Sequence, residues 1–170
     1  MTKRVVWIVV FTAAAALLQS TILRRLAIYR AVPDLALGII VYAAYVNGTM
    51  TGQLSGFFSG LLMDFLSAAP LGLNTLVRTL VGALAGIMQG TFFLDVFFLP
   101  MALCAGATTL KALLYFLLHL LMAGIVPSYD FLTPVFWVEL AMNTLTAPLL
   151  FGFLRLFEPL LAGRGEAGGR

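Results

Sequence analysis

Charged residues and cysteines are both scarce in this chain. Only 10% of its 170 residues are charged, whereas 62% are hydrophobic and the mean hydropathy is +1.05. A typical soluble domain carries about 25% charged residues, and one small core could not bury this much apolar surface. Cys104 is the only cysteine, which excludes an internal disulfide framework. The composition therefore predicts a membrane-integral protein.

The sequence patterns of enzymes are also missing. The chain shows no serine–histidine–acid arrangement of recognisable spacing, no paired histidine–glutamate metal motif and no phosphate-cradling glycine loop. Eight of its ten basic residues lie near the two ends or after the first apolar stretch, which fits anchoring at lipid headgroups rather than a nucleic-acid surface. We therefore predict a non-enzyme with no catalytic residue, no cofactor, no metal site and no nucleic-acid partner.

Apolar stretches that suit membrane spans recur along the chain. A spanning helix needs roughly 17–25 residues. The pattern predicts an all-α polytopic bundle of about six transmembrane helices, with five or seven as alternatives: residues 5–23, 33–46, 50–66, 72–94, 100–126 and 134–157. The first is interpreted as an uncleaved helix, because its alanines lie inside the apolar stretch. The second is short, so its full crossing stays open. We assign residues 1–161 to one domain and residues 162–170 to a flexible tail.

The basic residues also bear on orientation. Six spans would put both termini on one side of the membrane. Near the termini the chain carries five basic residues: Lys3, Arg4, Arg155, Arg164 and Arg170. A cluster of three arginines between residues 24 and 30 would lie on the opposite side. The positive-inside rule then favours cytoplasmic termini by a narrow margin.

Glycines recur every fourth residue on both arms of a predicted hairpin. On the first arm Gly48 precedes the third span, which carries Gly52, Gly56 and Gly60 before Asp64. On the second arm the fourth span carries Arg78 before Gly82, Gly86 and Gly90. Small residues at this spacing let helix backbones approach closely, which drives helix association in lipid. We predict that these glycines pack helices inside the subunit. The alternative is that part of the groove receives a helix of a partner protein.

The hairpin also predicts a charge pair. Folding it symmetrically about residue 71 gives four facing pairs: Gly52–Gly90, Gly56–Gly86, Gly60–Gly82 and Asp64–Arg78. An unpaired charge inside a membrane costs about 2.5–3.5 kcal/mol or more. We therefore expect Asp64 and Arg78 to form an ion pair or to share a polar network, which in its simplest form fixes the register of the hairpin.

Three further ionisable residues lie in apolar stretches. They are Lys111, His119 and Glu139. His119 and Glu139 are equidistant from residue 129, so a symmetric connection would let them meet. A proton relay would need a chain of such groups across the bilayer, and nothing in the sequence links these residues to Asp64.

Several motifs between residues 33 and 86 carry a family resemblance. They are Pro33-Asp34 at the start of the second span, the glycines leading to Leu61-Leu62-Met63-Asp64, Pro70-Leu71-Gly72-Leu73-Asn74, and Thr79-Leu80-Val81-Gly82 followed by Gly86. This segment resembles the MreD family of rod shape-determining proteins. One departure is Asn47-Gly48-Thr49, where family members often carry the basic residues of a cytoplasmic loop.

The resemblance implies a multi-pass protein of the bacterial inner membrane. It implies pairing with MreC, a single-span protein, and indirect association with the MreB filament, RodA and a class B penicillin-binding transpeptidase of peptidoglycan synthesis. The family is similar in fold to the substrate-binding subunits of energy-coupling-factor transporters. A scaffold of the elongation machinery is thus the leading hypothesis. A vitamin-binding transporter subunit is the alternative, with Asn74, Arg78, Tyr115 and Glu139 as candidate pocket residues, and a proton-coupled carrier ranks third.

Overall fold

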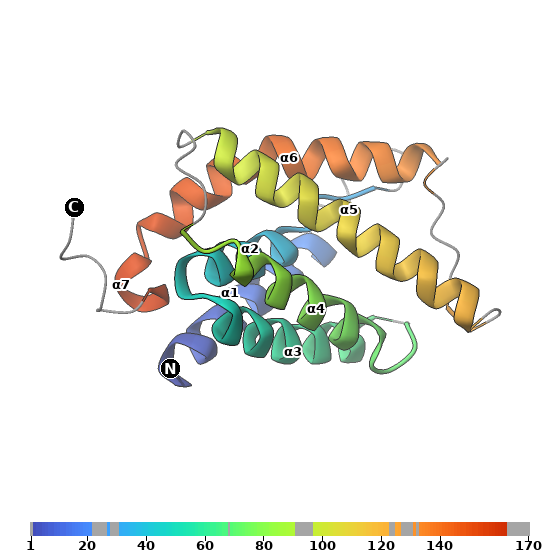
Figure 1. Ribbon diagram of the computed structural model, residues 1–170, viewed down its shortest axis with the longest axis horizontal. Helices are drawn as coiled ribbons and strands as arrows, with labels where there is room; N and C mark the ends of the chain where they lie inside the picture. Colours follow the sequence, from blue (N-terminus) through green and yellow to red (C-terminus); the bar gives the residue numbers. More distant parts are fainter. Residues whose placement is uncertain are drawn as a thin grey trace.

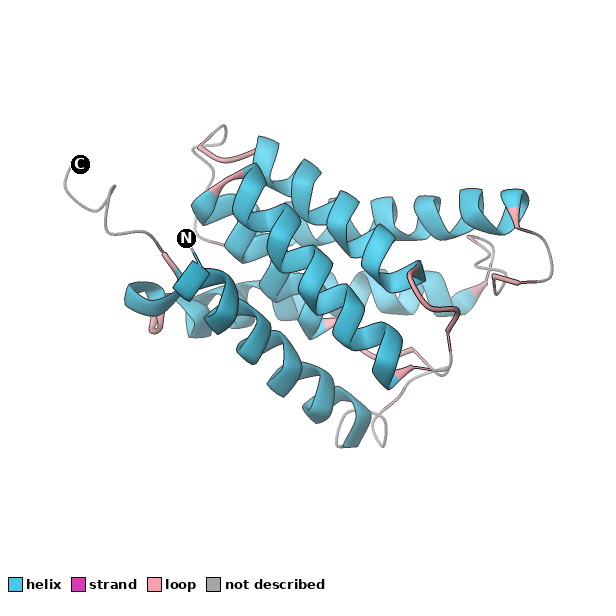
Figure 2. Ribbon diagram, turned by 90° about the horizontal axis from the view of Figure 1, so that it is seen from below, coloured by secondary structure: helices cyan, strands magenta, loops and turns pink. Residues whose placement is uncertain are grey.

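The computed structural model describes residues 2–21, 27, 31–67, 69–90, 97–122, 125–126, 131 and 133–162, and every element in these ranges is a helix (Figure 2). The helices are α1 (Thr2–Thr21), α2 (Leu35–Asn47), α3 (Thr49–Leu66), α4 (Leu73–Ile87), α5 (Phe98–Leu121), α6 (Pro134–Arg155) and α7 (Glu158–Leu161). By length and composition, α1, α5 and α6 could each cross a membrane, whereas α2 and α4 are shorter apolar helices.

The all-α polytopic bundle predicted from the sequence is confirmed. Helices α1 to α6 correspond to the six predicted spans, although α4 ends at Ile87 rather than near residue 94. At 1.5 Å per residue, α2 and α4 are about 20 and 22 Å long, shorter than the roughly 30 Å of bilayer hydrocarbon. The number of full crossings therefore stays a prediction. The predicted tail beyond residue 162 and the arginines between residues 24 and 30 lie outside the described residues.

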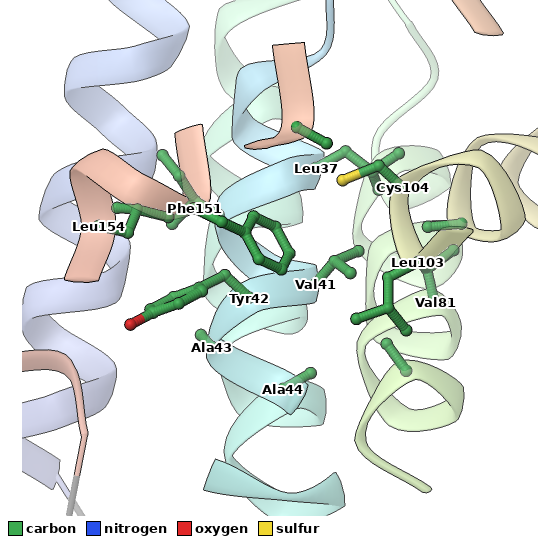
Figure 3. Packing of buried hydrophobic residues seen from close by; sticks show 14 of the residues in the cluster. Leu37, Val41, Tyr42, Ala43, Ala44, Val81, Leu103, Cys104, Phe151 and Leu154 are labelled. Atoms are coloured by element: carbon green, nitrogen blue, oxygen red, sulfur yellow. The ribbon is translucent and has the colours of Figure 1, made fainter. Parts of the chain in front are cut away.

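Helix α2 lies at the centre of the bundle. The α5–α6 pair packs on one side of it and the α3–α4 pair on the other (Figure 1). Every residue of α2 from Ala36 to Ala44 is buried, as expected for a helix that is apolar on all faces. Figure 3 shows Tyr42 against Phe151 of α6, with ring centroids 5.1 Å apart, and Val41 facing Leu103 of α5.

The first and last helices meet at one end of the bundle. The rings of Phe11 and Phe157 have centroids 5.1 Å apart. The side chain of Asn47, at the end of α2, donates a hydrogen bond of 2.9 Å to the carbonyl of Leu161. Figure 1 shows the start of α1 and the short helix α7 near the same end of the bundle. That both termini lie on one side of the membrane stays a prediction, as does the side that faces the cytoplasm.

Candidate functional site

Glycines bring α3 and α4 into backbone contact. A Cβ atom at Gly56 would lie 2.7 Å from the carbonyl carbon of Arg78, and one at Gly82 would lie 2.7 Å from the carbonyl carbon of Gly52. Gly60 and Gly86 are equally close to the backbone of the facing helix. Such distances leave no room for any side chain. The glycine face of α3 is therefore filled by a helix of the same chain.

The register of this hairpin differs from the symmetric one. Gly52 faces Gly82 rather than Gly90, and Gly56 faces Arg78 rather than Gly86. Gly90 lies beyond the end of α4, is exposed, adopts φ +68° and has no atom within 4 Å of an added Cβ. The prediction that Gly90 packs against Gly52 is thus wrong. A symmetric fold fails because α3 continues past the level at which α4 begins.

The extension of α3 past the start of α4 explains the position of Asp64. Its carboxylate lies beyond the N-terminus of α4 and accepts hydrogen bonds from the backbone N–H groups of Gly72 (2.9 Å), Asn74 (2.9 Å) and Thr75 (3.1 Å). The side chains of Asn74 and Thr75 also donate to it. The first N–H groups of a helix have no partner within the helix, and a negative charge there is stabilising. Asp64 thus caps α4 from the end of α3.

Arg78 pairs with Asp34 rather than with Asp64. Its Nη2 atom lies 3.0 Å from both carboxylate oxygens of Asp34, and both side chains are almost fully buried. The prediction of an Asp64–Arg78 ion pair, which came from the symmetric hairpin, is therefore wrong. The physical reason is that backbone donors already satisfy the Asp64 carboxylate, whereas the guanidinium needs a counter-ion inside the bundle. Asp34 supplies that charge from the start of α2.

Asp34 joins four helices. Besides capping α2 through the N–H of Leu37 at 3.0 Å, its carboxylate lies 2.9 Å from Nζ of Lys111 on α5. Lys111 also donates to Glu139 of α6. The backbone N–H of Asp34 donates to the side-chain carbonyl of Asn143, also on α6, at 2.6 Å. We call Asp34, Arg78, Lys111 and Glu139 the charge cluster; it balances two acidic against two basic groups.

Polar residues next to the charge cluster extend it toward α4 and α5. The amide of Asn143 donates to the hydroxyl of Thr108 at 3.0 Å, and the hydroxyl of Tyr115 donates to the side-chain carbonyl of Asn74 at 2.8 Å. The cavity beside Asp34 holds about 10 Å³, which suits one water molecule at most. Small-molecule sites usually enclose about 300–1,000 Å³. The cluster thus holds helices together and does not line a ligand-sized cavity at this point.

The candidate pocket residues of the sequence lie in or next to the charge cluster, whereas His119 bonds elsewhere. Asn74, Arg78, Tyr115 and Glu139, expected to line a vitamin pocket, bond to partners within the protein. His119 donates from Nδ1 to the carbonyl of Val126 at 2.7 Å. Within the described ranges, no group of three His, Cys, Asp or Glu side chains could hold a metal ion.

The motifs of the resemblance are structural in this fold. The Pro33 carbonyl accepts a hydrogen bond from Gln19 at 2.7 Å, which ties α1 to the start of α2. Gly72 adopts φ +92° at the turn before α4, a left-handed conformation that favours glycine. Leu71 is largely exposed, and the Pro70 carbonyl accepts the N–H of Leu73. The motif residues therefore form two helix starts, each capped by an aspartate.

Sequence reasoning overlooked the role of Lys111, Asn143 and Thr108 in this site. All three are polar residues inside long apolar helices, and polar groups at such depth need partners. That signal could have grouped them with Asp34. The spacing alone could not identify the partners, because they come from helices far apart in the chain.

Together these features define a small polytopic helical membrane protein with a glycine-packed hairpin and an internal charge cluster. The family model described as rod shape-determining protein MreD matches residues 1–157. The chain belongs to this family, and it is thus an integral inner-membrane protein of the rod-shape-determining machinery. The family is a structural component of that machinery rather than a known class of enzyme. No curated protein and no solved structure matched the chain.

Proposed function

We propose that this protein is a non-catalytic scaffold that holds the single transmembrane helix of an MreC-like partner and so positions the cell-wall elongation complex. The observation that carries the proposal is that the charged groups of the cluster pair with one another inside the bundle, whereas large apolar side chains are exposed on the described helices. Such a surface is suited to other helices and to lipid. The small cavity beside Asp34 favours this function over vitamin binding.

The glycine face of α3 cannot serve as the partner contact, because α4 already fills it. Ser55 and Ser59 form a second face of small residues on α3, and this face is also covered within the chain, since both side chains are fully buried. The partner helix must therefore bind elsewhere on the bundle.

The groove between α4 and α5 offers a suitable surface. Its volume is about 190 Å³, and residues that line it include Leu84 and Ala85 of α4, Met88 directly after α4, and Ala102 and Gly106 of α5. Ala102 and Gly106 are exposed and four residues apart, and an added Cβ at Gly106 would have open space. Exposed small residues at this spacing let a second helix approach the backbone closely. We therefore assign the partner helix to this groove.

The test is co-expression with a tagged MreC-like partner, followed by co-purification in mild detergent. Gly106→Leu would fill the groove and should abolish recovery of the complex without disturbing the fold. Gly152→Leu is the matched control, since Gly152 of α6 is also exposed with open space around it. Retention of the complex by Gly106→Leu would remove the α4–α5 groove as the contact. Failure of the wild-type chain to bind any such partner would overturn the scaffold function itself.

A further inference from the structure

A second groove lies between α1 and α3, and its chemistry differs from that of the α4–α5 groove. It has a volume of about 390 Å³. Its walls are branched or aromatic rather than small: Val5, Val6, Val9 and Val10 of α1, with Leu54 and Phe58 of α3. The groove therefore lacks the small residues that favour close packing of a second helix, and its branched apolar walls suit a lipid acyl chain.

The dimensions agree with a single alkyl chain. The groove follows α1 from Thr2 to Val10, which is about 12 Å along the helix axis. An acyl chain that lies along the groove would contact the valine side chains of α1 over this length.

Basic residues stand at one end of this groove. Lys3 is exposed and Arg4 is partly exposed in the first turn of α1, beside the groove residue Thr2. In the described part of the chain neither has an acidic partner, and α1 carries no acidic residue. The positive end of the α1 dipole adds to the same field. An anionic headgroup is therefore favoured where the acyl chain would leave the groove.

We propose that the α1–α3 groove binds an anionic glycerophospholipid of the surrounding bilayer. One acyl chain lies against Val5, Val9 and Leu54, and the phosphate lies beside Lys3 and Arg4. The site would select the lipid by its charge and hold it by its chain. The α1–α3 groove is separate from the α4–α5 groove, so the test of lipid binding does not depend on the scaffold function.

Tryptophan fluorescence can test the site in the full-length protein. Trp7 is 42% exposed, one helical turn after Arg4, whereas Trp137 is 59% exposed near the other end of the bundle. The Trp137→Phe chain, reconstituted in vesicles of brominated phosphatidylglycerol and phosphatidylcholine, reports lipid binding at Trp7 alone. Each basic residue near an anionic headgroup should give about a fivefold preference for phosphatidylglycerol. Added salt should weaken that preference.

Two sets of variants separate the charge from the groove. Lys3→Gln with Arg4→Gln should abolish the preference at Trp7. Val9→Phe, which fills the groove, should lower it with both charges in place. Leu84→Phe fills the α4–α5 groove instead and should have no effect. In the Trp7→Phe background, unchanged quenching of Trp137 by brominated phosphatidylcholine shows that each variant is folded.

Three results would overturn the proposal. Equal quenching of Trp7 by the two lipids would show that there is no anionic site. A preference that survives Val9→Phe would show that the basic residues attract headgroups without a chain in the groove. Protection of Trp7 from both brominated lipids by a co-reconstituted partner would show that a protein helix is the occupant.

Discussion

The two helical hairpins of the bundle are held together in opposite ways. In α3–α4 the two helix backbones are in direct contact, because Gly52, Gly56 and Gly82 have no side chains to separate them. In α5–α6 the contact includes polar side chains, with Lys111 bonded to Glu139 and Asn143 bonded to Thr108. The first hairpin is thus sensitive to any added atom, and the second is sensitive to the loss of charge.

Asp34 is the point at which the two hairpins are joined. Its carboxylate binds Arg78 of the first hairpin and Lys111 of the second. Because Asp34 also caps α2, the orientation of the central helix depends on both hairpins. The proposed scaffold function would need such a fixed relation between the faces of the bundle, so that a partner bound on one side is positioned relative to the other.

The largest effect is expected in the glycine-packed hairpin. Gly56→Leu would place a side chain inside the backbone of Arg78 and should destabilise the bundle by about 4 kcal/mol or more. Gly106→Leu adds the same side chain to α5 in open space and should change stability by less than about 0.5 kcal/mol. Unfolding by denaturing detergent, followed by circular dichroism, measures both. Equal stability of the two variants would contradict the backbone contact.

The next largest effect is expected at Asp34, which joins the two hairpins. Asp34→Asn keeps the shape of the side chain but removes the counter-charge of the buried Arg78 and one of the two carboxylates that Lys111 contacts, which should cost about 3–5 kcal/mol. Glu158→Gln, in the exposed first turn of α7, is the matched change of an acid to an amide and should cost less than about 0.5 kcal/mol. The same unfolding measurement applies. A small loss at Asp34 would mean that the charge cluster is not the joint between the hairpins.

A double-mutant cycle sharpens the assignment of Arg78. Asp34→Asn combined with Arg78→Gln should show a coupling energy of about 1.5–3 kcal/mol, because the two side chains are bonded. Asp64→Asn combined with Arg78→Gln should be additive within about 0.5 kcal/mol. If instead the strong coupling appears between residues 64 and 78, the symmetric register of the hairpin is the correct one.

The sequence predicts the helices of this bundle better than their partners. Apolar stretches and glycine spacing locate α1 to α6 within a few residues at most ends, and they identify α3–α4 as the close-packed pair. The predicted partner of Arg78, Asp64, was the wrong residue, because a symmetric hairpin assumes that both helices reach the turn at the same level. Asp64 caps α4 only because α3 runs further.

The cluster around Asp34 shows a second limit. Lys111 and Glu139 stand out as charged residues in apolar helices. Their meeting with Asp34 depends on how α5 and α6 rotate and slide against α2, which no periodicity along the chain specifies. Pro33-Asp34 was correctly associated with a helix start, and the cap on α2 confirms it. The ion pairs of the same aspartate needed the tertiary structure.

The smallest effect is expected at Asp64, although this residue accepts hydrogen bonds from both backbone and side chains. Asp64→Asn keeps one acceptor oxygen, so only the charge at the N-terminus of α4 and part of the bonding are lost, at a cost of about 1–2 kcal/mol. The loss should be local. Amide hydrogen exchange should therefore accelerate at Gly72, Asn74 and Thr75 while it stays unchanged in α5 and α6. Thr109→Val is the control, because the exposed Thr109 hydroxyl bonds only to the Ala105 carbonyl of its own helix. This change should leave exchange at the start of α4 unaffected. Acceleration of exchange throughout α5 and α6 would instead show that Asp64 belongs to the joint between the hairpins and that the two capped helix starts form one cooperative unit.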